Sequence, residues 1–167
     1  MIENKVENSG LIQIDPFQLI QKYPIKYFDI SKLFGESPFL VEKVFRKNLS
    51  ETVIDLEDHE CLALFCSADV ILPKWAFMLV LSHFTSQDIK VVVLDEKSSL
   101  EAKWRAIRSV YNYEQHRDQK IIVKGCSTFD DQEFLTDFAR ELTPIVSNLM
   151  FGEACSAVPI NKKRKVK

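Results

Sequence analysis

The chain has few glycines and no long apolar run, and each absence excludes a class of protein. Only 4 of its 167 residues are glycine, which leaves no glycine-rich loop of either kind that binds nucleotide phosphates. No apolar run approaches the roughly 20 residues that a membrane-spanning helix needs. The first residues, MIENKVENSG, lack the basic and then apolar order of a secretion signal. We therefore expect a cytoplasmic protein with no membrane partner.

Signatures built on closely spaced cysteines are missing too. The chain has 4 cysteines, but none lies in the C-x-x-C pair that is typical of zinc ribbons and thioredoxins. A cytoplasmic location would keep these cysteines as reduced thiols. No Ser-His-Asp, H-E-x-x-H or paired-carboxylate signature identifies a catalytic site. The sequence therefore leaves open whether the protein is an enzyme.

Positive charge is concentrated at one end of the chain. The net charge is −2, and five basic side chains lie within residues 162–167. Without these five charges, residues 1–161 carry a net charge of −7. Because nucleic-acid binding needs clustered Lys and Arg, this acidic body indicates no nucleic-acid partner. The end KKRKVK is similar to a short nuclear localisation signal, but a disordered tail over residues 161–167, dispensable for folding, is the simpler interpretation.

Strands and helices alternate clearly from Glu60 onward. The expected strands lie at 61–66, 89–94 and 120–124, and the expected helices lie at about 73–84, 98–111 and 131–150. Pro144 should kink the last helix or divide it in two. Such alternation is typical of right-handed βαβ units, so we predict an α/β fold with a mixed, mostly parallel central sheet that contains all three strands and is flanked by helices. Additional N-terminal strands are expected at Leu11–Ile14 and Tyr27–Ile30, within a single domain over residues 1–160.

Two cysteines follow predicted strands and precede predicted helices. Cys66 ends the first of the three strands, and Cys126 comes shortly after the third. If these strands are parallel neighbours, both thiols lie at the edge of the sheet where α/β proteins bind ligands. Each would also lie near a helix N-terminus, which favours the thiolate, and two thiolates could bind a soft metal or act as nucleophiles. The simpler interpretation is that Cys66 is a core thiol and Cys126 a turn residue.

The remaining cysteines and the histidines carry weaker signals. Cys155 follows the last predicted helix and would approach the other two thiols only if residues 152–160 run back in extended form. Cys61 lies on the opposite side of its strand and is expected in the core. His83, on a mostly apolar helix, is expected to be partly buried with its hydrogen bonds satisfied, and His116, in a polar stretch, is expected to be solvated.

Three short motifs give the chain a family resemblance. The motifs are C-S-A-D at 66–69, G-C-S at 125–127 and G-E-A-C-S at 152–156. Together they resemble a family of bacterial proteins of unknown function, DUF2480, which is found mainly in Bacteroidetes, and the resemblance extends over nearly the whole chain. It supplies no activity, but it groups Cys66, Cys126 and Cys155 and implies a link to iron–sulfur assembly.

These observations leave three hypotheses about function. In the first, a cytoplasmic accessory protein uses Cys66, Cys126 and Cys155 as a thiolate site that holds zinc or iron, or handles sulfur together with iron–sulfur assembly proteins. In the second, the protein is a non-catalytic interaction or scaffold protein with structurally packed cysteines. In the third, Cys66 or Cys126 is the nucleophile of an enzyme, for which no base can be identified. Homo-oligomer formation is compatible with all three.

Overall fold

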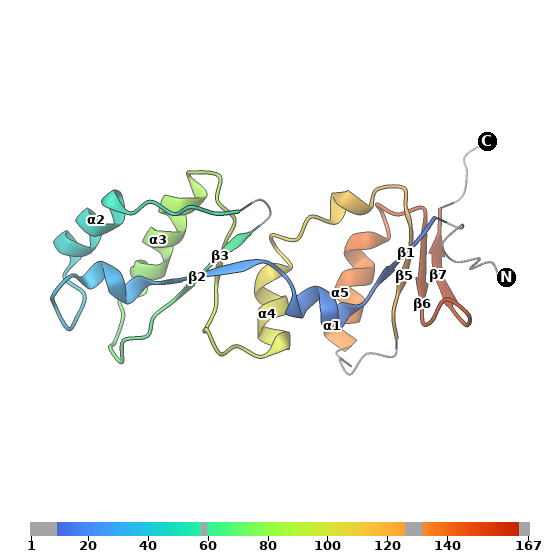
Figure 1. Cartoon of the computed structure of the whole chain (residues 1–167), viewed down its shortest axis with the longest axis horizontal. Helices are drawn as coiled ribbons and strands as arrows, with labels where there is room; N and C mark the ends of the chain where they lie inside the picture. The colour runs from blue at the N-terminus through green and yellow to red at the C-terminus, as the bar shows by residue number, and fades with distance from the viewer. Residues whose placement is uncertain (1–9, 58–59, 126–131, 164–167) are drawn as a thin grey trace. The chain divides into compact units, whose positions relative to one another are not determined.

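The chain divides into two compact units, each with its own sheet (Figure 1). A computed structural model describes residues 10–57, 60–125 and 132–163. The central unit runs from Tyr23 to Val110, and the terminal unit combines Met1–Lys22 with Tyr111–Lys167. No helix of the described residues is long and apolar enough to cross a membrane.

In the residues that the structure describes, the central unit is built on three parallel strands. In sheet order these are β2 (Ile25–Asp29), β3 (Cys61–Phe65) and β4 (Val91–Val93). Its helices are η2, a 3-10 helix (Ile30–Phe34), α2 (Glu42–Glu51), α3 (Trp75–Thr85) and α4 (Leu100–Ile107). Since every strand is parallel to its neighbour, the carboxyl ends of all three strands lie at one edge of the sheet.

The middle strand of this sheet is buried on both faces. Leu62 and Leu64 are fully buried in one cluster with Phe45 of α2 and Val80 of α3. The alternate residue Ala63 points to the other face and is fully buried as well. This double burial explains why β3 is a continuous apolar run, as expected for a strand of a parallel sheet with both faces covered.

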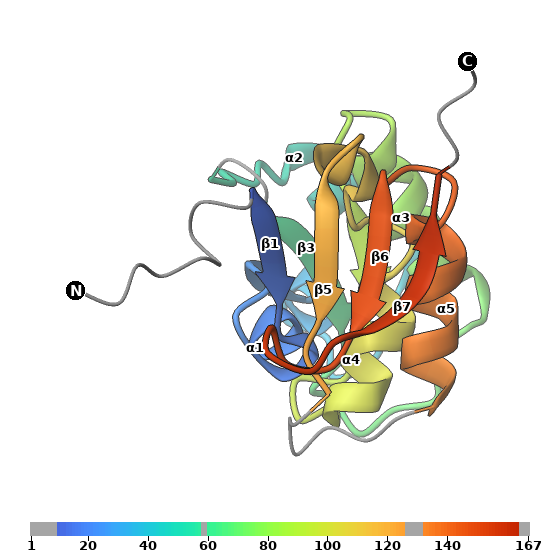
Figure 2. The same cartoon turned by 90° about the vertical axis from the view of Figure 1, so that its right-hand side faces the viewer.

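The described part of the terminal unit forms a sheet of four strands, three of them parallel. In sheet order these are β1 (Leu11–Ile14), β5 (Lys120–Val123), β6 (Asn148–Phe151) and β7 (Val158–Lys162), and only β7 is antiparallel to its neighbour (Figure 2). Its helices are α1 (Pro16–Gln21), η3, a 3-10 helix (Tyr113–His116), and α5 (Gln132–Leu142). Phe134, Phe138 and Leu142 bury one face of α5 completely.

The α/β class, the mostly parallel strands and the flanking helices are confirmed. The prediction that one sheet contains all three strands was wrong. Strands β3 and β4 share a sheet, but β5 lies in the other sheet, between β1 and β6. The alternation of strands and helices in the sequence indicates only local conformation. The sheet to which a strand belongs depends on pairing with residues far along the chain, such as the pairing of Leu11 with Lys120.

The helix expected to run to residue 150 ends much earlier. α5 ends at Leu142, and the backbone N–H groups of Ile145 and Val146 close a turn onto the Leu142 carbonyl. Pro144 lies in this turn, because its ring and its missing N–H do not suit a helix interior. The next residues form β6, which pairs with β5. Residue 131, the expected start of the helix, lies outside the described residues.

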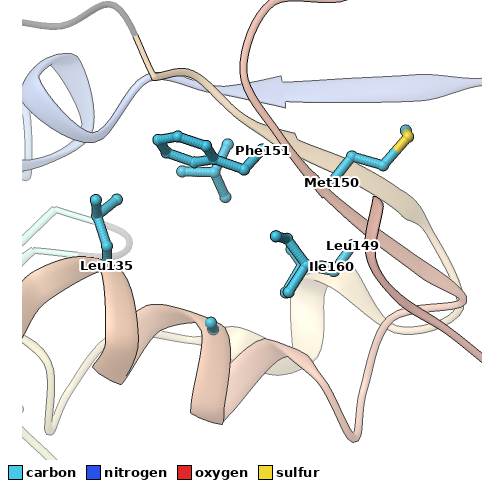
Figure 3. A pocket seen from close by; sticks show the side chains of 7 residues that line it. Leu135, Leu149, Met150, Phe151 and Ile160 are labelled. Carbon is cyan, nitrogen blue, oxygen red and sulfur yellow. The ribbon is translucent and has the colours of Figure 1, made fainter. Parts of the chain in front are cut away.

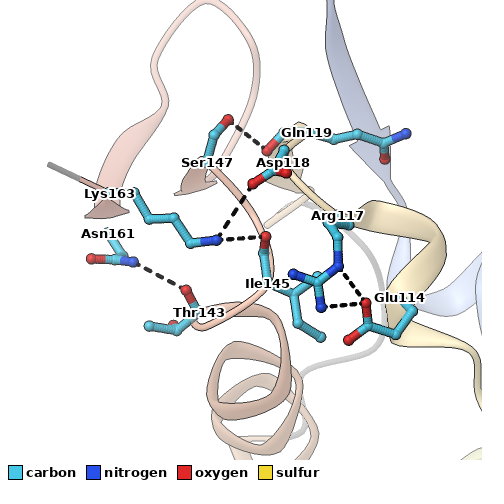
Figure 4. Close-up of polar contacts among 9 residues, drawn as sticks. All are labelled: Glu114, Arg117, Asp118, Gln119, Thr143, Ile145, Ser147, Asn161 and Lys163. Atoms are coloured by element: carbon cyan, nitrogen blue, oxygen red, sulfur yellow. Dashed lines mark hydrogen bonds and ion pairs between the residues drawn. The ribbon is translucent and has the colours of Figure 1, made fainter. Parts of the chain in front are cut away.

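The basic end of the chain begins as part of the sheet. Strand β7 continues through Lys162, so the tail boundary expected after Ile160 falls inside a strand. The Nζ group of Lys163 donates a hydrogen bond to the Ile145 carbonyl (2.9 Å) and lies 3.6 Å from the Asp118 carboxylate (Figure 4). Residues 164–167 lie outside the described part of the chain.

Candidate functional site

The carboxyl edge of the central sheet brings together polar side chains from two strands. Asp29 is the last residue of β2 and is in register with Phe65, the last residue of β3. Cys66 and Ser67 follow directly. This is the edge at which open α/β sheets bind their ligands, so its geometry decides which chemistry the central unit can support there.

Asp29 connects the segments that follow β2 and β3. Its Oδ1 accepts hydrogen bonds from the backbone N–H groups of Ser31 (3.0 Å) and Ser67 (3.1 Å), and its Oδ2 accepts one from the Ser67 hydroxyl. Burial would raise the pKa of Asp29, but the hydrogen bonds from Ser67 and Ser31 outweigh burial and lower it. A carboxylate with a lowered pKa is a weak base, so Asp29 positions Ser67 and does not activate its hydroxyl as a nucleophile.

Cys66 does not have the thiolate character that the sequence led us to expect. Burial raises the pKa of its thiol, a backbone hydrogen bond at Ala68 lowers it, and the Asp29 carboxylate raises it, with a raised pKa as the net result. The thiol donates to the Ala68 carbonyl, with Sγ 3.7 Å from the oxygen. Burial is the largest cause of the raised pKa, and the next helix begins only at Trp75, several residues further along the chain.

The other predicted cysteines have different surroundings. Cys61 is fully buried, and burial is the main cause that raises its pKa to about 11, so it is the core thiol that was predicted. Cys155 is exposed, belongs to the terminal unit and lies between β6 and β7, with its Sγ 4.0 Å from the Ser156 hydroxyl. Cys126 lies outside the described residues.

A metal site formed by the three serine-flanked cysteines therefore stays a prediction. Within the described residues, no group of three His, Cys, Asp or Glu side chains lies close enough together to hold a metal ion. The described residues do not include Cys126, so this finding does not test a site that contains it.

His116 is buried, and the expectation of a solvated histidine was wrong. Its Nε2 lies 2.8 Å from the Tyr111 hydroxyl, and its Nδ1 lies 3.3 Å from Oε1 of Gln119. Burial lowers the pKa of His116, and the Gln119 hydrogen bond acts in the opposite direction. The neighbouring tyrosines in the segment YNYEQH were the one sequence signal of a buried environment.

A polar cleft lies between α2 and α3 in the central unit, and sequence reasoning missed it. Its volume is about 240 Å³. The polar side chains that line it are Arg46, Ser50, Ser82, His83 and Ser86. His83 is half-buried and its Nε2 lies 3.0 Å from Nε2 of Gln87, which confirms a partly buried histidine with a hydrogen-bond partner. Arg46 gave no sequence signal because a charged residue on a short helix usually faces water.

A smaller hollow in the terminal unit is apolar. It has a volume of about 90 Å³ and lies between α5 and the strands β5, β6 and β7 (Figure 3). Leu135 points into it from the helix, and Leu149, Phe151 and Ile160 line it from the strands (Figure 3). None of its lining residues has a charged or hydrogen-bonding side chain, so the hollow could contact an apolar group but could not recognise a polar one.

The comparison with known proteins agrees with the family resemblance of the three motifs. The model of the family described as "Protein of unknown function (DUF2480)" matches residues 1–163. No curated protein and no solved structure matches the chain. Because the family model matches nearly all of the 167 residues, the chain belongs to the DUF2480 family.

Proposed function

We propose that this chain is a non-catalytic interaction protein that associates with a second copy of itself through helix α3. The observation that carries the proposal is the apolar outer side of this helix, where Met78 is 70% exposed and Leu81 is 36% exposed. The opposite side, with Ala76, Val80 and Phe84, is fully buried in the core of the central unit.

The first turns of α3 are apolar on the core side and on the outer side alike, and exposed polar residues follow only at Ser82 and Thr85. On an ordinary surface helix, charged and polar residues occupy the side away from the core. The sequence of α3, WAFMLVLSHFT, instead continues apolar residues onto that side. Shortly before the helix, Ile71 is fully exposed. Exposed large apolar side chains in and next to one helix are typical of an interaction surface.

The absence of charge on α3 favours a second copy as the partner. In a two-fold symmetric dimer the same surface of each copy faces the other. A charged helix at such a contact would therefore meet its own charge on the partner copy. Among the described α-helices of at least eight residues, only α3 contains no Asp, Glu, Lys or Arg. Met78 adds a flexible side chain that adapts to a copy of itself.

The carboxyl edge of the central sheet supports a binding role rather than a catalytic one. A raised pKa keeps the Cys66 thiol protonated at neutral pH, and a lowered pKa makes Asp29 a poor base. Both shifts oppose nucleophilic chemistry at this edge. They fit the hypothesis of structurally packed cysteines better than the hypothesis of a thiol-dependent enzyme.

Light scattering during size-exclusion chromatography tests the self-association. We expect a dimer for the wild type, and we expect Met78→Glu to weaken it by about tenfold or more, because a carboxylate would be buried without a partner. Val53→Glu is the matched control, since it replaces another exposed apolar side chain (89% exposed) of the same unit by the same charge. A monomeric wild type, or a Met78→Glu variant that dimerises like Val53→Glu, would overturn the proposal.

Metal or sulfur handling by Cys66, with Cys126 and Cys155, is the second candidate function. Burial and, to a smaller extent, the Asp29 carboxylate raise the pKa of the Cys66 thiol, and it is this carboxylate that favours the function, because it would attract a cation that replaces the thiol proton. Elemental analysis of protein purified without chelator tests it. Zinc or iron bound in equimolar amount, and lost in Cys66→Ser, supports this function, whereas metal-free protein contradicts the metal-binding form of it.

A further inference from the structure

We propose that the cleft between α2 and α3 binds a small anion: a phosphate or carboxylate group on a molecule that also carries hydroxyl groups. The two helices lie side by side in the central unit (Figure 1), and the cleft is open to solvent between them. The inference is argued from Arg46, Ser82 and His83 and does not rest on the proposed self-association, which is argued from Met78 and Leu81.

The size and lining of the cleft suit a ligand of a few heavy atoms. Its volume of about 240 Å³ lies a little below the usual range of pockets for drug-sized ligands. Leu49 and Leu79 contribute apolar surface, and the other lining residues are the arginine, the histidine and the three serines. None of the lining residues that the structure describes is acidic. An anion would therefore meet no carboxylate in the lining of the cleft.

Arg46 is held in place before any ligand arrives. Its Nε donates a hydrogen bond to Oε1 of Glu42 (2.8 Å), and its guanidinium lies 5.7 Å from the centre of the Trp75 ring. Its two terminal nitrogens make no hydrogen bond within the described part of the chain. A guanidinium fixed in this way keeps free donors for an anionic group, which it can bind through two parallel hydrogen bonds.

The serines determine what else the ligand should carry. The Ser50 hydroxyl donates to the Lys47 carbonyl and the Ser86 hydroxyl donates to the His83 carbonyl, both at 2.7 Å. The oxygens of these two hydroxyls therefore remain available as acceptors only. The Ser82 hydroxyl makes no hydrogen bond within the described chain, so it can also donate. A ligand with an anionic group and neighbouring hydroxyl groups satisfies both kinds of partner.

The two helices that line the cleft together carry a net positive charge, in contrast to the chain as a whole. Helix α3 carries no Asp, Glu, Lys or Arg, and α2 carries three basic and two acidic side chains. Residues 1–161 as a whole have a net charge of −7. A locally positive, partly enclosed surface on an acidic protein concentrates small anions at that place.

A titration followed by ¹⁵N-resolved NMR tests the proposal with three ligands that differ in one group. Glycerol 3-phosphate and glycerate carry an anionic group next to hydroxyls, and glycerol carries hydroxyls alone. We expect amide shifts on α2 and α3 with at least one of the two anions, at dissociation constants of about 1 mM. The anion that binds with the lower dissociation constant shows whether the cleft prefers a phosphate or a carboxylate group. Glycerol should cause no such shifts.

Variants in the cleft decide whether these shifts report the site. Arg46→Gln should weaken binding about tenfold, because it removes charge-assisted hydrogen bonds, whereas Lys47→Gln, on the same helix outside the cleft, should not. Ser82→Asp should abolish binding and Ser82→Asn should not, which separates charge from altered packing. The proposal is overturned if neither anion binds, if glycerol binds equally well, if the shifts lie elsewhere, or if Arg46→Gln and Ser82→Asp bind like wild type.

Discussion

The Tyr111 hydroxyl and Nε2 of His116 lie 2.8 Å apart, and both side chains are buried in the terminal unit. The histidine is thus held in its neutral form by a burial that disfavours its charge. This relationship makes the stability of the protein depend on pH in a direction that can be worked out.

Acid should destabilise the protein through His116. Its pKa in the folded chain is lowered from the ordinary value of 6.5, so the unfolded chain takes up a proton near pH 6.5 that the folded chain resists. This contribution to stability is complete above that value and falls as the pH decreases toward the folded pKa. In urea unfolding at about pH 7.5 and about pH 5.5, the wild type should lose more stability than His116→Asn, which cannot titrate.

Tyr111→Phe is the control for this measurement. It should lower stability by about 1 kcal/mol at both pH values, because a buried hydrogen bond is lost, and it should keep the pH dependence. An equal pH dependence in wild type and His116→Asn would show that another group is responsible.

The three thiols that the structure describes should react in a fixed order with iodoacetamide at neutral pH. Cys155 is exposed and should react first, Cys66 should react slowly because its pKa is raised, and Cys61 should react only after unfolding. Asp29→Asn should speed the reaction of Cys66, since it removes a carboxylate that raises the pKa of the thiol. Mass spectrometry of tryptic peptides follows each cysteine separately.

Asp55→Asn, which neutralises an exposed carboxylate elsewhere in the same unit, is the control for that variant. Equal acceleration in both variants would mean that net charge, and not the neighbourhood of Asp29, governs the reactivity of Cys66.

Removal of the last residues should cost stability, contrary to the expectation of a dispensable tail. Leu149 pairs with Asn161 and Asn148 pairs with Lys162, so a chain that ends at Ile160 loses the last two pairs of β7. Its melting temperature should fall by roughly 2–4 °C for each kcal/mol lost, relative to a chain that ends at Lys163. Equal melting temperatures in differential scanning calorimetry would show that these pairs contribute nothing.

Sequence reasoning identified most elements of the fold because their signals are local. The valines of β4 and the apolar run of β3 identify strands directly. Strand β6 was hidden, since Ile145 and Leu149 are four residues apart and fit a helix equally well. Only the pairing of β6 with β5 distinguishes the two, and that pairing joins segments on either side of α5.

The candidate sites depended even more on distant contacts. Cys66 was found from its place after a strand, but its raised pKa depends partly on Asp29, a residue of another strand. The cleft at Arg46 exists because α2 and α3 pack side by side, and no pattern within either helix contains that information. Local sequence indicates which side chains follow a strand, whereas tertiary packing sets their chemistry.

The division of the chain into a continuous central unit and a discontinuous terminal unit has a consequence for synthesis on the ribosome. Among the described strands, β1 pairs with β5 alone, and Leu11 must wait for Lys120 to leave the ribosome before that pairing can begin. All strands of the central unit lie between them in the chain and are synthesised first. We therefore expect nascent chains to form β2–β4 early and to carry β1 unpaired through most of translation, when it is most exposed to chaperones and proteases.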